Sequence, residues 1–369
     1  MELELSEDQE FFLETTRKFL ASEATIPAVR DLESAPAGYA DAYWRQAAEL
    51  GWTSMLIGEQ DGGGSLSEHG LLDLVLIAEE MGRHVAPGPL GPVNVVATAL
   101  SAAGSEVQRA AVLPGLLDGS AVAAWTGHIA IDATVADGTI TLTGSAPQVE
   151  AGAQAAHVLV TARSAEGVSL VLVPADAAGL TVTPLEGLDL VRRWASVACD
   201  GVALPVADAV VGSVGGAATE VERLLQVACV LQCAETCGVI DRVFEMTVEY
   251  LGDRYSFGRP LSSYQALKHR LADDKMNLEA CHGIASAAAR AVATGAPNAL
   301  ELVSIAKRWI GPISTELIQD GVQLHGGIGV TWEHDLHLYL RRATVNRVTH
   351  GSPDWHADRV AALQLGEAS

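Results

Sequence analysis

The sequence predicts a mainly helical protein with a small β domain in the middle of the chain. Three observations support this fold class, and they follow one another along the 369 residues. Apolar residues recur at helical spacing over residues 1–118, short β-type runs occupy residues 119–212, and long helical stretches return over residues 213–369. We therefore expect an N-terminal helical domain, a middle β domain and a C-terminal helical bundle.

The N-terminal segment begins with a helix start signal. Ser6 is a candidate N-cap ahead of EDQEFFLETTRKFLASEA, a run in which apolar residues recur at helical spacing. Glycines at positions 62–64 and prolines at 87, 89 and 92 indicate loops. Between these loops, LLDLVLIAEEMGRH is typical of a strongly amphipathic helix.

Residues 119–212 have a different residue pattern. It contains the runs TITLTG, AHVLVTA, GVSLVLVPA and LTVTPL, which are rich in β-branched residues and separated by Gly, Asp and Pro turns. This pattern predicts a small β domain.

The C-terminal segment returns to helices without a β pattern between them. The stretches EVERLLQVACVLQCAETCGVIDRVFEMTVEYLGDR and LADDKMNLEACHGIASAAARAVATG are long enough for a four-helix bundle. Cys229, Cys233 and Cys237 recur every fourth residue in the first stretch. This spacing indicates a buried helical stripe rather than a metal site.

Composition excludes several classes of partner. The chain has 46 acidic and 23 basic residues, a formal charge of -23, which disfavours binding to nucleic acid or to anionic membranes. Its five cysteines form no CxxC pair, which fits a reducing cytoplasm. The N-terminus lacks the features of a signal peptide, and no run of 18 apolar residues occurs. We expect a cytoplasmic protein that does not span a membrane.

Two segments of the last third carry a specific combination of residues. The first, RYSFGRPLSSYQALKHRLAD, begins at Arg254, and the second, QLHGGIGVTWEHDLHLYLRR, begins at Gln323. In this order and spacing they resemble the two C-terminal signatures of acyl-CoA dehydrogenases. GWTSMLIGEQDGGGSLSEHGLLDLVLIAEEMGRHVAPGP resembles the helical entry segment of the same family, so the similarity covers almost the whole chain.

The resemblance implies a fold and an activity. It implies a dimer or tetramer of subunits, each with a helical domain, a β-barrel domain and a four-helix bundle, and FAD at a subunit interface. It also implies α,β-dehydrogenation of an acyl-CoA thioester, in which a carboxylate removes the α-proton and the flavin accepts the β-hydride. An electron-transfer flavoprotein is the expected electron acceptor.

The two signatures have the chemistry of a nucleotide site. Gly326 and Gly327 let backbone donors approach a pyrophosphate, Arg254 offers a forked cation, and Gln265 and Gln323 offer neutral polar contacts. In the family these motifs hold the ADP half of the FAD whose ring lies in the neighbouring subunit. The predicted cofactor-binding residues are Arg254, Ser256, Phe257, Tyr264, Gln265, Gln323, Gly326 and Gly327.

The catalytic carboxylate of the family is missing. Most members carry it in a Glu-Gly-Thr loop after the second signature, where this chain has His350; a subset carries it on the first bundle helix, at the position of Ala228, followed here by Cys229. Glu222-Arg223 lies six residues too early and is predicted to be a surface salt-bridging pair. We therefore predict no catalytic residue and no metal ligand. His350 remains an alternative base, because its unperturbed pKa lies near neutrality.

The flavin-ring contacts are altered as well. The family loop of the type Thr-Glu-Pro-Gly-Ala-Gly-Ser corresponds to AAWTGHIAIDATVADG, which retains Thr126 and is shortened. The family's Trp-Ile-Thr aligns with Gln148, Val149 and Glu150, so a carboxylate stands where a hydroxyl bonds near flavin N5. Such a carboxylate would oppose the negative charge of reduced flavin.

An intact ADP-binding half beside these losses resembles the non-catalytic subunits of actinobacterial heterotetrameric (α2β2) acyl-CoA dehydrogenases of steroid side-chain degradation. The resemblance implies a catalytic partner subunit that supplies the glutamate, the flavin-ring contacts and the acyl-CoA pocket. Three alternatives stay open. They are a self-sufficient dehydrogenase with His350 as a displaced base, a family member recruited to another flavin chemistry, and a structural scaffold without flavin contact.

Overall fold

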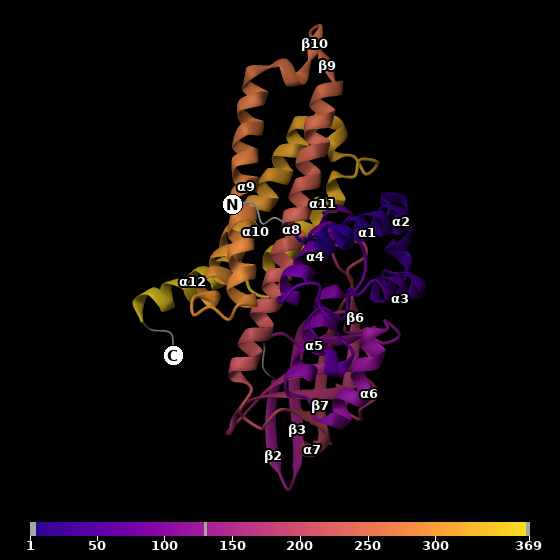
Figure 1. The fold of residues 1–369 in the computed structure, drawn as a ribbon, viewed down its shortest axis with the longest axis vertical. Helices are drawn as coiled ribbons and strands as arrows, with labels where there is room; N and C mark the ends of the chain where they lie inside the picture. Colours follow the sequence, from indigo (N-terminus) through magenta and orange to yellow (C-terminus); the bar gives the residue numbers. More distant parts are fainter. Residues whose placement is uncertain (1–4, 129–130, 367–369) are drawn as a thin grey trace.

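The computed structural model describes residues 5–128 and 131–366 and shows an elongated molecule (Figure 1). The helical bundle with a small hairpin forms one end, the sheet lies at the other end, and the first helices pack beside the middle. This arrangement confirms the predicted fold class, in which helical segments flank a central β domain.

Six helices and two short 3-10 turns lie in the described part of the N-terminal segment, from residue 5 onward. Ser6 caps the first helix as predicted: its hydroxyl accepts a hydrogen bond from the Gln9 amide at 3.2 Å, and the Gln9 side chain accepts one from the Ser6 amide. The predicted amphipathic helix is α4, whose apolar stripe is buried. The elements are α1 (Glu7–Glu23), α2 (Ile26–Asp31), η1 (Leu32–Ser34), α3 (Asp41–Glu49), η2 (Glu59–Asp61), α4 (Gly70–Arg83), α5 (Leu90–Ala103) and α6 (Glu106–Leu117).

The strand-rich segment forms one mixed sheet in the order β6-β7-β3-β2-β4-β5-β8, with β1 added beside β4. β1 and β2 run parallel to β4, and the other pairs are antiparallel. Along β4, Val158 and Val160 enter a core within the sheet, whereas Leu159 between them faces the helices. The strands are β1 (Ala123–Trp125), β2 (Ile131–Ala136), β3 (Thr139–Glu150), β4 (His157–Ser164), β5 (Gly167–Pro174), β6 (Leu180–Leu185), β7 (Trp194–Pro205) and β8 (Val210–Val211), with the short helix α7 (Val206–Ala209) before β8.

Long antiparallel helices form the C-terminal bundle. The predicted cysteine stripe is confirmed, because Cys229, Cys233 and Cys237 all lie buried on one helix, α8. By length and composition α8 could cross a membrane, but it is the buried central helix of the bundle. The elements are α8 (Ala218–Asp253), β9 (Tyr255–Ser256), β10 (Arg259–Pro260), η3 (Leu261–Ser263), α9 (Gln265–Ala293), α10 (Ala299–His325), η4 (Gly326–Val330), α11 (Leu336–Val348) and α12 (Pro353–Leu365).

Glycines bring α4 and α8 into close contact. A Cβ on Gly82 would lie 1.9 Å from the Glu235 carbonyl oxygen, and one on Gly238 would lie 1.8 Å from the Glu79 carbonyl oxygen. Only glycine permits such an approach of two helix backbones. The crossing fixes the N-terminal helices against the bundle, and it positions the residues of the site described next.

Candidate functional site

A hairpin projects from the end of the bundle and carries the first predicted signature (Figure 1). Its two-residue turn is Phe257-Gly258, with φ of 49° and 80°, so both residues adopt the left-handed conformation of a tight hairpin turn. The Phe257 side chain is 96% exposed. The Tyr264 hydroxyl donates to the Ser256 carbonyl at 2.9 Å, and this bond ties the hairpin to the start of α9.

The second signature lies at the C-terminal end of α10 and in η4. Gly326 has φ of 66°, and a Cβ on either Gly326 or Gly327 would meet no atom within 4 Å. The Gln323 side chain is exposed. His325 stacks on Tyr250 of α8 at 4.4 Å between ring centroids, so the ends of α8 and α10 lie together.

The structure therefore brings both signatures to the same end of the bundle. Arg254, Phe257, Gln265 and Gln323 present exposed side chains there, and the two glycines present an uncovered backbone. A guanidinium, two amides, open backbone donors and an exposed ring are chemically suited to a nucleotide diphosphate. Ser256 and Tyr264 are half-buried, and their contact with each other supports the hairpin.

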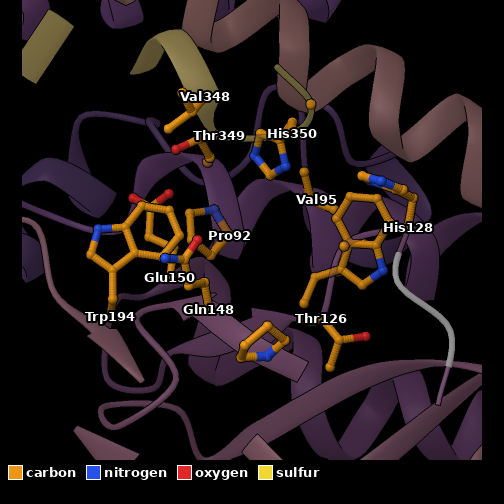
Figure 2. Close-up of a pocket in the computed structure, with 15 residues that line it drawn as sticks. Pro92, Val95, Thr126, His128, Gln148, Glu150, Trp194, Val348, Thr349 and His350 are labelled. Atoms are coloured by element: carbon orange, nitrogen blue, oxygen red, sulfur yellow. The ribbon is translucent and has the colours of Figure 1, made fainter. Parts of the chain in front are cut away.

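A cavity of about 250 Å³ lies between the sheet, α5 and the loop after α11 (Figure 2). It is lined by Thr126, the residue predicted to be retained in the altered loop, and by Gln148 and Glu150, where flavin-ring contacts were predicted to be lost. Two indole rings and two imidazoles complete much of its wall. The lining residues besides these three include Pro92, Val95, Trp125, His128, Trp194, Val348, Thr349 and His350.

A smaller hollow of about 40 Å³ lies beside this cavity, and both predicted base positions line it. Ala228 reaches it from α8, and His350 reaches it from the loop between α11 and α12. Glu150 and Glu235 also line the hollow. The two alternative positions of the family's carboxylate thus converge in space, and neither holds a carboxylate in this chain.

The surroundings of His350 make its imidazole a weak base. Burial, together with the charge of Lys307, lowers the pKa of His350 to about 3. The imidazole ring of His350 stacks on Trp125 at 6.3 Å between centroids. The backbone carbonyl oxygen of His350 lies 3.2 Å from His356 Nε2. An imidazole whose conjugate acid is so strong holds an abstracted proton weakly.

Glu150 is the acidic residue of the larger cavity. Its carboxylate lies 3.2 Å from the Arg192 guanidinium. Burial raises the pKa of Glu150 above its usual range even though Arg192 opposes the shift. Sequence reasoning found Glu150 by alignment but missed its partner, because nothing local signals that Arg192 turns toward it.

A buried ion network extends from this pair. Arg192 donates to both carboxylate oxygens of Glu235 at 2.8 Å, and Arg342 donates to Glu235 at 2.6 Å and to Asp189 at 2.5 Å. Although burial works against it, the two arginines hold the pKa of Glu235 below its ordinary value. Glu235 is therefore an ionised, fully engaged carboxylate, and an engaged carboxylate is a poor base.

The prediction for Glu222 and Arg223 has a definite outcome. Glu222 and Arg223 do form salt bridges, but the prediction that they pair with each other is wrong: Glu222 binds Arg359 at 2.6 Å and Arg223 binds Glu220 at 2.7 Å. Adjacent helical residues point in different directions, so each finds another partner. The Thr126 hydroxyl accepts from the Thr161 amide at 3.0 Å. The altered loop continues into residues 129–130, which lie outside the described part of the chain.

Comparisons with known proteins identify the family of the chain. The acyl-CoA dehydrogenase N-terminal domain matches residues 6–120, and the C-terminal domain of the same family matches residues 216–365. Acyl-CoA dehydrogenase IpdE2 of Mycobacterium tuberculosis is 30% identical over 94% of this chain and 92% of its own length.

Solved structures show the same fold. A variant of the steroid ACAD Tcur3481-Tcur3483 has a TM-score of 0.87 and 29% identity, covering 98% of this chain and 99% of that chain. A glutaryl-CoA dehydrogenase from Mycobacterium smegmatis, solved with FADH2, has a TM-score of 0.89 at 20% identity, covering 99% and 96%.

The fold and the two matched domains define a flavoprotein oxidoreductase of the kind that acts on CH–CH bonds. The chain belongs to the acyl-CoA dehydrogenase family.

Proposed function

We propose that this chain is the base-less subunit of a heteromeric acyl-CoA dehydrogenase and that its bundle end completes the FAD site of a catalytic partner chain. One contrast carries the proposal. The groups suited to the ADP half of FAD are exposed at the bundle end, whereas both positions for the catalytic carboxylate are occupied by Ala228 and His350. The chain has the groups that would bind the ADP half of a partner's FAD, and it lacks the base that catalysis in its own site would need.

The size of the cavity supports the proposal that the partner chain carries out the dehydrogenation. Its volume of about 250 Å³ falls below the roughly 300–1,000 Å³ of pockets for drug-sized ligands. A flavin ring and an acyl thioester together need more room than that. The nearby carboxylates of Glu150 and Glu235 both form ion pairs with Arg192, so neither is well suited to remove a proton from the substrate.

The exposed hairpin supports a role toward another chain. Phe257 is 96% exposed and holds a left-handed conformation that costs a non-glycine residue about 1–2 kcal/mol. Exposure of a phenyl ring and backbone strain bring the isolated chain no stability. Both make sense if the ring is covered by a partner or by the nucleotide that the partner holds.

Each group at the bundle end would have a distinct task. Arg254 would pair with the diphosphate, the backbone at Gly326 and Gly327 would approach its oxygens, and Gln265 and Gln323 would hydrogen-bond the nucleotide. FAD, when bound, supplies the acceptor for the hydride, and the partner would supply the base and the acyl-CoA pocket.

The similarity to a steroid ACAD at 29% identity supports an acyl-CoA ester with a steroid as its acyl group. We propose an α2β2 assembly with the catalytic partner. We propose an electron-transfer flavoprotein as acceptor. The five cysteines are free and buried, which favours the cytoplasm as the location.

Flavin stoichiometry tests the proposal. The chain should be purified alone and together with a co-expressed family member that retains the glutamate. We expect no bound FAD in the lone chain, one FAD per pair in the complex, and loss of most of that FAD with Arg254→Ala or Gln323→Ala. A lone chain with one FAD per chain and full acyl-CoA dehydrogenation would contradict the proposal.

A self-sufficient dehydrogenase is the second candidate, and the raised pKa of Glu150 favours it. A buried carboxylate with a raised pKa in a cavity is a recognised mark of a catalytic base. If this alternative is right, Glu150→Gln abolishes turnover in the lone chain while its FAD content stays unchanged, and His350→Gln has the same effect if His350 is the base instead. Oxygen consumption without enoyl-CoA formation would point to another flavin chemistry.

A further inference from the structure

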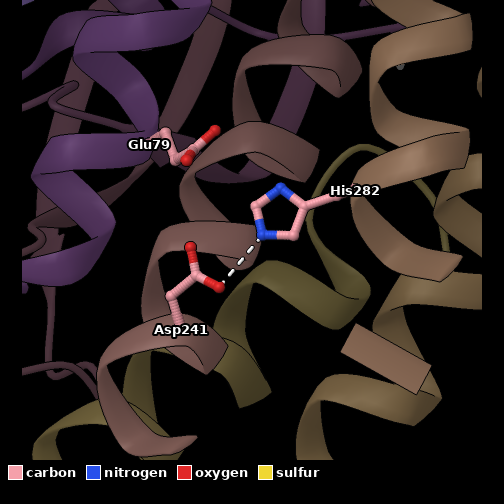
Figure 3. Close-up of side chains that lie close together, drawn as sticks. All are labelled: Glu79, Asp241 and His282. Carbon is pink, nitrogen blue, oxygen red and sulfur yellow. Dashed lines mark hydrogen bonds and ion pairs between the residues drawn. The ribbon is translucent and has the colours of Figure 1, made fainter. Parts of the chain in front are cut away.

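Three side chains that commonly bind metals meet where α4 crosses α8 and α9, away from the flavin-related surfaces (Figure 3). Glu79 comes from α4, Asp241 from α8 and His282 from α9, and one ligand atom of each lies within 4.8 Å of the others. The close contacts at Gly82 and Gly238 hold these helices at that distance. The cluster therefore joins the N-terminal helices to the bundle.

Asp241 has partners within the cluster, whereas Glu79 has none among the described residues. His282 Nε2 lies 3.0 Å from one oxygen of Asp241, and Arg83 lies 3.5 Å from the other. Arg83 is already engaged by Glu245 at 2.6 and 2.7 Å. The carboxylate of Glu79 makes neither a hydrogen bond nor an ion pair with any residue in ranges 5–128 and 131–366, although the residue is half-buried.

A partly buried carboxylate without a hydrogen-bond or ion-pair partner is unfavourable, so a bound cation would stabilise the Glu79 side chain. Within the described residues no cationic group lies at ion-pairing distance from its oxygens, although His282 lies close by. A cation placed between Glu79, Asp241 and His282 would satisfy all three groups.

We propose that Glu79, Asp241 and His282 form a binding site for a divalent transition-metal ion, with zinc as the best fit. Two carboxylate oxygens and one imidazole nitrogen are a ligand set that zinc accepts, with bonds of about 2.0–2.2 Å and water in the fourth position. Tetrahedral geometry with such bonds separates ligand atoms by roughly 3.4 Å. The side chains thus need to close by little more than an ångström. Calcium and magnesium are poorer fits, because they prefer oxygen ligands alone.

The ion would act as a clamp between two parts of the molecule. It would link α4 of the N-terminal segment to two helices of the bundle, and α8 also carries Ala228 and Glu235 of the candidate site. The inference is independent of the proposed function, because it concerns no residue of the flavin surfaces and holds whether or not the chain has a catalytic partner.

Metal titration of the full-length chain tests the inference. After removal of metals with a chelator and dialysis, titration calorimetry with zinc chloride should show saturable binding that Glu79→Gln and His282→Asn each weaken about tenfold or more. Glu279→Gln is the matched control, because it removes an acidic group from the same helix as His282 without removing a ligand. At a zinc concentration of 100 times the dissociation constant, Tm should rise by about 3–4 °C in the wild type and in Glu279→Gln only.

Three results would overturn the site: absence of saturable zinc binding by the wild type, wild-type affinity in Glu79→Gln, or equal loss in the Glu279→Gln control. If a variant does not fold, crystals of the wild type soaked with zinc decide the matter. An anomalous difference peak at the zinc edge between α4, α8 and α9 would establish the site, and a peak only elsewhere would refute it.

Discussion

At the scale of single residues, Phe257 shows how a functional position differs from a structural one. The side chain is almost fully exposed and gains no stability from burial. Its backbone adopts a left-handed conformation that glycine adopts without cost. Nothing in the described part of the chain compensates for either feature. Under the proposed function, Phe257 would contact the partner chain or the nucleotide that the partner holds.

The first prediction follows from this conflict. Phe257→Gly should leave the Tm of the lone chain unchanged or slightly higher, because the turn strain is relieved at the expense of a ring that packs on nothing. In the complex with a catalytic partner, the same change should lower the FAD content severalfold, as measured by flavin absorbance per pair. Phe11→Ala is the control, since Phe11 is 73% exposed on α1 and should affect neither quantity. A large fall in the Tm of the lone chain would show that Phe257 packs internally after all.

His356 illustrates the opposite case, an ionisable group held neutral by the fold. The side chain is fully buried, and burial lowers its pKa to about 3. Between pH 6.5 and 3 the unfolded chain therefore binds a proton at this residue that the folded chain does not bind. The free energy of unfolding must fall as the pH falls through this range.

The second prediction concerns this fall of the free energy of unfolding at low pH. His356→Gln keeps a donor for the His350 carbonyl but removes the titration. Relative to the variant, the wild type should lose about 1.4 kcal/mol of stability per pH unit below pH 6. Urea unfolding at pH 7.5, 6 and 5 measures the difference. Parallel pH dependences of the two proteins would show that His356 is protonated in the fold.

At the scale of elements, the crossing of α4 and α8 depends on the absence of side chains at two positions. The glycines at 82 and 238 let each helix backbone touch the other, and the carboxylates and the histidine of the proposed metal site lie one turn away. Helix propensity argues against glycine within a helix. Its presence at both contact points shows that packing between elements has overridden local preference.

The third prediction compares glycines of the same helix. Gly238→Ala should cost about 3 kcal/mol, because the new methyl group would clash with the Glu79 carbonyl and force the helices apart. Gly252→Ala, also on α8, should stabilise by up to about 1 kcal/mol, because its Cβ meets nothing within 4 Å. Chemical denaturation measures both. Equal effects of the two changes would refute the close crossing.

At the scale of the whole molecule, Arg342 joins the three segments of the chain. From α11 it donates to Asp189 before β7, to Glu235 on α8 and to the Ala86 carbonyl after α4. Its side chain is 1% exposed. A guanidinium can serve so many partners because it has five donors in a planar fork.

The fourth prediction separates this residue from its neighbour. Arg342→Met should reduce the free energy of unfolding by about 3–5 kcal/mol, because buried Asp189 would lose its ion-pair partner and buried Glu235 would lose one of its two. Arg341→Met should cost less than about 1 kcal/mol, since Arg341 is partly exposed and donates only to the Leu188 carbonyl. Thermal and urea unfolding of the two variants check the difference. A small effect at Arg342 would mean that the network is not a structural junction.

The whole-molecule view also bears on the proposed assembly. The hairpin of β9 and β10 lies at the tip of the bundle (Figure 1), whereas the cavity is lined from the sheet, α5 and the loop after α11. Under the proposed function, the ADP half and the ring half of a flavin site would therefore lie in different parts of one chain. One FAD per pair of unlike chains is the stoichiometry expected of the complex.

The sequence by itself determined the succession of helical and β segments, the capped first helix, the cysteine stripe, the family motifs and the absence of a carboxylate at positions 228 and 350. These features depend on local periodicity or on residue identity, which the chain carries before it folds. Only the tertiary structure decided that Ala228 and His350 line one hollow, that Arg192 and Arg342 neutralise Glu150 and Glu235, and that Glu79 meets Asp241 and His282. Such contacts join residues far apart in sequence, and no local pattern specifies which buried charge will face which partner once the helices have packed.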